Sequence, residues 1–157
     1  MSAALAPPFI VASLLLCVAG AMKLRSSPRL SMRALGVGEI VLGVACAVHP
    51  TRPLAVALAV VYGSFAAVAT VLRRRRLACG CFGENDIPVS LAHVIAGELL
   101  GTVALAAALA GPRGLGWLLG QPAPTAVAVL IGVAGAVYAT VLIYTLVPRA
   151  WVQWSGE

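Results

Sequence analysis

Long apolar runs separated by short polar connectors dominate the pattern of this chain. Five runs, at about residues 3–22, 32–48, 54–72, 91–110 and 125–147, are rich in Ala, Val, Leu and Gly. A helix rises 1.5 Å per residue, so ~20 apolar residues cross the hydrocarbon core of a bilayer. The runs lack the alternation of apolar and polar positions that a barrel strand requires. The pattern therefore predicts five transmembrane helices.

The predicted fold is an all-α, polytopic membrane helix bundle that forms one integral membrane domain over residues 1–157. Lipid leaves backbone N–H and C=O groups unsatisfied, so each span must be helical. The composition agrees, because only 10% of the residues are charged, against about 25% in soluble domains. The first run has the apolar character of a signal peptide, but no Lys or Arg precedes it, and we expect a retained helix.

Basic residues gather on one side of the predicted bundle. Most of the eleven Lys and Arg residues lie in two clusters, at residues 23–33 and 73–76. The positive-inside rule assigns this side to the cytoplasm, with the N-terminus outside and the C-terminus inside a bacterial inner membrane. The net charge of +6 thus indicates topology and contact with membrane lipid, and no nucleic acid is expected.

Small residues within the runs predict close helix contacts. Gly97 and Gly101 form a G-x-x-x-G spacing, which lets two helices approach because no side chain keeps their backbones apart. We expect this contact within one chain, and a homodimer seam is the alternative. Residues 111–124, rich in Gly and Pro, are expected to form a tight outer connector.

A pair of cysteines in the connector after the third run is the strongest chemical signal. Cys79 and Cys81 flank Gly80, which permits a turn that brings two Cα atoms within the ~4.4–6.8 Å of a disulfide. A bridge in so small a ring is strained and exchanges easily. The arginines that end at Arg76, and a helix start with Ser90 as N-cap, favour the thiolate. We predict a redox pair.

Two other interpretations of this pair remain open. In the first, the two thiolates bind Cu(I), which accepts two sulfur ligands. Zinc is disfavoured, because it requires four ligands and the spacing matches no common zinc pattern. In the second, the bundle is a structural assembly factor and the cysteines are incidental. No cofactor is evident, and no motif supports a quinone or copper.

Two further thiols fall inside the predicted spans. Cys17 lies toward the inner end of the first run, near the level of Cys79 and Cys81, and is a candidate third, resolving thiol. Its alternative role is that of a small apolar filler, as for most buried cysteines. Cys46 lies deeper in the second run, and we do not expect it to bridge Cys17.

Two carboxylates, Glu39 and Glu98, also fall within spans, where an ionisable group usually faces a partner or a cavity. Glu39 shares one helix face with Gly43 and Cys46, by their i, i+4, i+7 spacing. Lys23, at the inner end of the first run, is expected either to snorkel or to pair with Glu39. Glu39 then serves either in helix packing or as a proton acceptor in thiol chemistry.

His93 opens the fourth run and carries a side chain that titrates near neutral pH. We expect it in the headgroup region.

The sequence C-G-C-F-G after an Arg-rich helix end resembles the family of the methylamine-utilisation protein MauE, a branch of the DoxX-like membrane proteins. A-G-A-M-K-L at Ala19–Leu24 and the central Glu39 of the second run add to the resemblance, which covers about residues 9 to 110. It implies a four-helix membrane core, and the fifth run is a C-terminal helix that lies outside the resemblance. It also implies a role in forming or reducing disulfides of exported proteins, carried by Cys79 and Cys81.

The leading hypothesis is an inner-membrane thiol–disulfide redox protein, possessing oxidoreductase activity, that exchanges electrons with a thioredoxin-like partner or an exported client. The charge rule places the Cys79–Cys81 connector in the cytoplasm, whereas exported disulfides form outside. Either electrons are relayed across the membrane, or the bundle is inverted.

Overall fold

The computed structural model describes residues 3–75 and 89–146. Within these ranges every regular element is a helix: α1 (Ala6–Ser26), α2 (Leu30–Val48), α3 (Arg52–Arg74), α4 (Leu91–Ala110), α5 (Leu115–Leu119) and α6 (Ala123–Thr145). Five of them, all except α5, are long and apolar enough to cross a membrane. The predicted all-α fold and its five spans are therefore confirmed.

The helix ends differ from the apolar runs by a few residues. α1 and α3 continue past their runs to Ser26 and Arg74, because a helix keeps its hydrogen bonds where the side chains turn polar. Pro7 and Pro8 lie in the first turn of α1, where a missing N–H donor costs little.

The connector between α4 and α6 is more than the predicted tight turn, because it contains the short helix α5. The buried side chain of Leu118 in α5 packs in a cluster with Ile10 of α1 and Val133 of α6. This contact holds the connector against the end of the bundle. It also explains why five residues fold as a helix that their length alone would not support.

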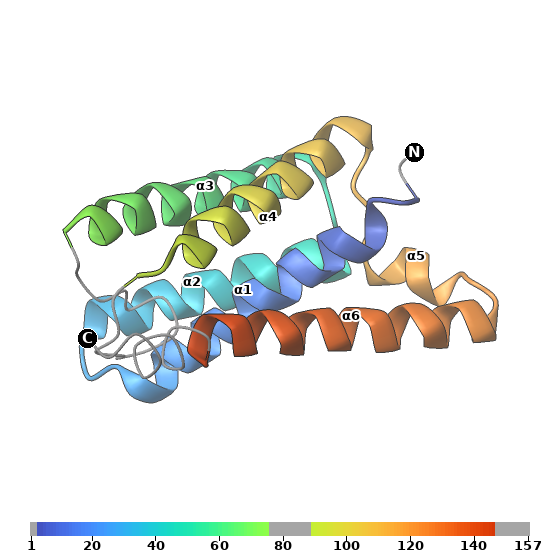
Figure 1. Ribbon diagram of the computed structural model, residues 1–157. Helices are drawn as coiled ribbons and strands as arrows, with labels where there is room; N and C mark the ends of the chain where they lie inside the picture. The colour runs from blue at the N-terminus through green and yellow to red at the C-terminus, as the bar shows by residue number, and fades with distance from the viewer. Residues whose placement is uncertain (1–2, 76–88, 147–157) are drawn as a thin grey trace.

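The helices form two close pairs and a looser sixth element (Figure 1). α1 packs along α2, and α3 packs along α4, while α1 also contacts α4 and α6. The central cluster draws on α1, α2, α3 and α4, with Phe9, Leu16 and Leu58 among its fully buried side chains. α6 runs along the side of α1 that lies away from α3. α1 is thus the centre of the bundle.

The exposed surface agrees with a lipid environment. Large apolar side chains are exposed along α2, α3, α4 and α6, whereas α1 (Ala6–Ser26) contributes none of them. In water such a surface would aggregate, but hydrocarbon chains solvate it. The described part of the chain is a multi-pass helical membrane protein.

Glycines set the closest helix contacts. A Cβ atom at Gly20 of α1 would overlap the carbonyl oxygen of Gly36 in α2, so the two backbones touch there. On α4, a Cβ at Gly97 would lie 3.1 Å from the Cβ of Ala66 in α3, and one at Gly101 would lie 3.6 Å from the backbone nitrogen of Gly63. The G-x-x-x-G spacing therefore serves a contact within one chain, as predicted.

Candidate functional site

A buried ion pair joins α1 and α2. The ammonium of Lys23 donates a hydrogen bond to Glu39 Oε1 at 2.5 Å, and the side chains are 3% and 2% exposed. The contact of Gly20 with Gly36 brings the two helices close enough for these side chains to meet within the bundle. The predicted pairing is confirmed, and its snorkelling alternative is wrong, because Lys23 is buried.

One carboxylate oxygen of the ion pair lacks a hydrogen-bond donor among the described residues. Glu39 Oε2 is buried and has no hydrogen-bond partner among the residues that the structure describes. Lys23 Nζ lies 5.2 Å from the ring centroid of Phe65, a cation–π contact that stabilises the ammonium. A buried carboxylate oxygen without a donor is costly, so this oxygen is the least satisfied part of the ion pair.

The predicted face of α2 is confirmed, because Glu39, Gly43 and Cys46 are all buried against the bundle. Cys17 of α1 packs on this face, where a Cβ at Gly43 would lie 2.5 Å from its sulfur. Cys17 Sγ lies 3.8 Å from the carbonyl oxygen of Ile40, and Cys46 Sγ lies 3.5 Å from that of Leu54. Both thiols are free, as expected, and the packing role fits each of them.

Glu98 faces no cavity or partner among the described residues, so the expectation that it faces one stays a prediction. Its side chain is exposed on the outer face of α4. The phase of the helix explains this, because Gly97 and Gly101 turn their face toward α3, and Glu98 lies about 100° around the helix from Gly97.

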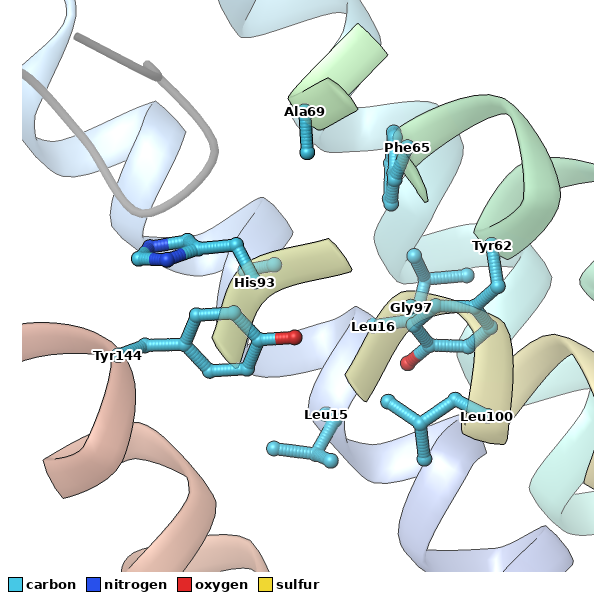
Figure 2. Close-up of a pocket in the computed structure, with 10 residues that line it drawn as sticks. Leu15, Leu16, Tyr62, Phe65, Ala69, His93, Gly97, Leu100 and Tyr144 are labelled. Atoms are coloured by element: carbon cyan, nitrogen blue, oxygen red, sulfur yellow. The ribbon is translucent and has the colours of Figure 1, made fainter. Parts of the chain in front are cut away.

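A small cavity of about 40 Å³ lies where α1, α3, α4 and α6 meet (Figure 2). We call it the inner cavity. Leucine side chains of α1 and α4 form much of its wall, and three residues bring polar atoms to it: Tyr62 of α3, His93 of α4 and Tyr144 of α6. The rings of His93 and Tyr144 lie side by side, and the Tyr144 hydroxyl points toward the centre of the cavity.

The start of α4 holds the His93 ring in place. Ser90 is the N-cap, as predicted, and its backbone N–H donates to His93 Nδ1 at 3.3 Å. The Ser90 hydroxyl lies 2.9 Å from the same Nδ1, so both polar groups of the N-cap residue fix the orientation of the ring. The ring packs edge to face with Tyr144, with centroids 4.6 Å apart. His93 is thus half-buried beside the cavity, and its expected place in the headgroup region stays a prediction.

Aromatic side chains connect the ion pair to the inner cavity. Phe65, which contacts Lys23, also lines the cavity and packs edge to face with Tyr62, with centroids 6.2 Å apart. The Tyr62 hydroxyl donates to the carbonyl oxygen of Ala12 at 2.6 Å, which fixes the tyrosine between α3 and α1. The Lys23–Glu39 ion pair and the polar atoms of the inner cavity are therefore linked by the rings of Phe65 and Tyr62.

The predicted redox segment lies outside the described residues. It includes Arg76, Cys79, Gly80 and Cys81, so the structure tests neither the pairing nor the roles assigned to them. The segment connects α3 to α4, and both helices wall the inner cavity near these ends, through Ala69 and His93. Among the described residues no group of three or more His, Cys, Asp or Glu side chains could hold a metal ion.

Sequence reasoning missed the cavity and two of its three polar residues. Tyr62 and Tyr144 lie in apolar runs, where single aromatic residues are common and give no signal of their own. A usable signal was that His93 falls near the start of the fourth run and Tyr144 near the end of the fifth. Antiparallel packing brings such ends to one level.

Comparison with protein-family models, with curated proteins and with solved structures finds no match to this chain.

Proposed function

We propose that this chain is a membrane thiol–disulfide redox protein in which Cys79 and Cys81 cycle between a disulfide and two thiols. In the oxidising half-reaction, a dithiol of a thioredoxin-like partner or an exported client is converted to a disulfide. The Cys79–Cys81 bond breaks, and the two cysteines take up the two electrons and two protons that the partner releases. The reverse exchange restores the bridge when the pair meets a suitable acceptor.

One observation carries the proposal. The Cys-Gly-Cys segment connects the two helices whose neighbouring ends wall the inner cavity, and that cavity is lined by His93 and Tyr144. Reduction of a disulfide consumes two protons, so a redox pair benefits from groups nearby that bind and release protons. The resemblance to the MauE family supports the same role, because its C-G-C-F-G signature coincides with this segment.

The buried ion pair is assigned a supporting role. Glu39 has one oxygen bound to Lys23 and one without a partner among the described residues, an arrangement suited to accepting a proton. We propose that Glu39 exchanges protons during the thiol cycle and that Lys23 keeps it ionised between cycles. Cys17 remains the proposed resolving thiol, and Arg76 the cation that favours the thiolate.

The proposed membrane is the bacterial inner membrane, with the Cys79–Cys81 segment on the cytoplasmic side. The basic clusters at residues 23–33 and 73–76 support this orientation. Delivery of disulfides to exported proteins then requires a second carrier that moves electrons across the bilayer. An inverted bundle would remove that requirement, so the orientation has to be measured together with the chemistry.

Thiol trapping in intact cells tests the proposal. Cells are quenched with acid, free thiols are alkylated with a bulky maleimide, and the number of modified cysteines is read from gel shifts. The variants C79S, C81S and C17S are compared with wild type, and C46S, in which a buried thiol without a proposed role is changed, is the matched control. A membrane-impermeant maleimide in a parallel sample reports the face on which the pair lies.

We expect a Cys79–Cys81 bridge that opens when the cellular reductant is in excess and closes when it is depleted. C46S should cycle as wild type does, whereas C79S and C81S should not. If both thiols stay reduced under every growth condition, the redox proposal is wrong. Copper that copurifies in stoichiometric amount and is lost in either variant would then favour the metal-binding interpretation.

A further inference from the structure

Exposed side chains form a continuous band along α4. The band consists of residues three or four positions apart that are all exposed: Leu91, Ile95, Glu98, Thr102, Leu105 and Leu109. We call it the α4 stripe. At about 100° per residue, its centre lies about 120° around the helix from Gly97, which faces α3. The α4 stripe therefore points away from the helix along which α4 packs.

The spacing of the α4 stripe is compatible with a second helix lying along it. Its intervals alternate between four and three residues, which is the heptad pattern of two helices that cross with a left-handed twist. From Leu91 to Leu109 it covers about 27 Å, most of a hydrocarbon core of about 30 Å. Exposed residues of α6, such as Val127, Ile131 and Tyr138, follow similar intervals, so spacing alone identifies no partner.

A carboxyl group within the membrane distinguishes the α4 stripe. Glu98 is the eighth of the twenty residues of α4, about 11 Å along the helix, which is farther than its side chain can reach. Among the described residues its carboxyl group has no hydrogen bond or ion pair. A carboxyl group that faces hydrocarbon is costly even when it takes up a proton, because its donor and acceptor are then unsatisfied.

Thr102 is the second polar residue of the α4 stripe and lies one turn beyond Glu98. Its hydroxyl donates to the carbonyl oxygen of Glu98 at 2.7 Å. The hydroxyl hydrogen is thus used within α4, while the hydroxyl oxygen can still accept a hydrogen bond. A helix that covers the α4 stripe has to bring both a donor and an acceptor to the level of Glu98.

A second copy of this chain meets that requirement. Copies with the same charge distribution insert in the same orientation, so two α4 helices related by a two-fold axis along the membrane normal are parallel. Each residue of the α4 stripe then lies at the same depth as its equivalent. Glu98 meets Glu98 of the second copy, and a neutral carboxyl group both donates and accepts. A different protein would need a matching polar residue at the same depth.

We infer that two copies of the chain associate through the α4 stripe, with the neutral carboxyl groups of their Glu98 residues hydrogen-bonded to each other. The oxygen of Thr102 is a further acceptor at the same level. The contact uses a different face of α4 from Gly97 and Gly101, which α3 already covers. This inference does not depend on the proposed redox function, because no cysteine takes part in it.

Dimerisation is measured on the purified full-length protein in phosphatidylcholine liposomes, by energy transfer between donor-labelled and acceptor-labelled copies at decreasing protein-to-lipid ratio. The critical variant is E98L, which places a lipid-compatible side chain on the exposed face and should fold normally. Its matched control is L99A, which changes the adjacent side chain, 62% exposed and outside the α4 stripe. We expect E98L to weaken dimerisation about tenfold or more and L99A to behave as wild type does.

E98Q tests the chemistry of the contact. A glutamine both donates and accepts without carrying a charge, so we expect E98Q to dimerise within about threefold of wild type. If E98Q loses the dimer as E98L does, the pairing of two neutral carboxyl groups is wrong. That result would favour an ionised Glu98 that pairs with a cation.

Cysteine cross-linking locates the contact. L105C places a new thiol on the α4 stripe, and I131C places one on α6, where Ile131 is 69% exposed; both are made in the C79S/C81S background. Oxidation with copper phenanthroline in native membranes should join two L105C chains and leave I131C chains unlinked. The inference is overturned by a monomer at every protein-to-lipid ratio, by a dimer that E98L does not weaken, or by linkage of I131C without linkage of L105C.

Discussion

The contact of α1 with α2 and the contact of α6 with the rest of the bundle are built from similar residues but differ in kind. Both α2 and α6 carry pairs of glycines. In α2, Gly36 and Gly43 meet the backbone or sulfur of α1, whereas in α6 a Cβ at Gly132 or Gly135 would meet nothing within 4 Å. Glycine spacing alone therefore does not locate a helix contact.

The difference follows from what each contact encloses. Between α1 and α2 lies the Lys23–Glu39 pair, which requires the helices to exclude lipid around two charges. α6 encloses no such pair in the described chain, and its outward side chains are solvated by lipid as well as they would be by protein. The first contact is expected to be rigid, and the second to be adjustable.

The largest effect is expected from K23M. The substitution keeps most of the side-chain volume but leaves Glu39 buried without its cation. Breaking a buried pair by removing one partner costs about 3–5 kcal/mol of stability. The free energy of unfolding, measured by titration with SDS in mixed micelles, should fall by this amount.

Two controls sharpen this result. R25M alters an exposed charge close to Lys23 on α1 and should change stability by less than about 0.5 kcal/mol. The double variant K23M/E39Q removes both charges and should recover part of the loss. A double variant as unstable as K23M would show that the pair itself is not the cause.

A smaller loss is expected from G20A. The added Cβ meets the carbonyl oxygen of Gly36, and because that atom belongs to the backbone, the two helices must separate. Overpacking of this kind costs about 1–3 kcal/mol. G38A is the control on the same helix pair, since nothing lies within 4 Å of its Cβ, and it should leave the unfolding curve unchanged or slightly more stable.

Y62F is expected to cost about 0.5–1.5 kcal/mol, because it removes the hydroxyl that donates to Ala12 while keeping the ring. Y138F makes the same change on α6, where the ring is 66% exposed, and should have no measurable effect. Equal unfolding curves for the two variants would contradict the view that Tyr62 ties α3 to α1.

The smallest effect is expected from G135L on α6, within about 0.5 kcal/mol, because the new side chain extends into open space. The measurement also includes the oligomeric state, by light scattering of the protein in detergent. Loss of a dimer in G135L would show that a second copy covers this face, and the contrast with α2 would then apply only to the single chain.

Features that depend on one helix, or on two helices that follow each other in the chain, could be predicted from the sequence. Apolar runs predicted the five spans, and the position of Lys23 at the end of one run predicted the ion pair with Glu39 as one of two alternatives. The helix α5 could not be predicted from the sequence, because Leu115–Leu119 lies between two glycines and is too short for a hydropathy window to detect. The burial of Leu118 against other helices, with Leu115 and Trp117 packed beside it, stabilises that turn.

The inner cavity could not be predicted for a different reason. It depends on which helices are adjacent, and His93 meets Tyr144 only because α6 packs beside α1 and α4. Apolar runs carry no information on that choice, since any lipid-facing surface suits any neighbour. The phase of α4 was predictable in principle, because the glycine pair that faces α3 turns Glu98 outward.

The ion pair also constrains how the protein enters the membrane. An acidic side chain near the centre of a lone helix costs about 2.5–3.5 kcal/mol on insertion. The α1–α2 hairpin neutralises that charge within itself, because Lys23 and Glu39 lie on either side of a turn of only three residues, 27–29. We expect α2 to partition into the bilayer together with α1 as one helical hairpin during synthesis, so that the first folding step takes place at the insertion machinery.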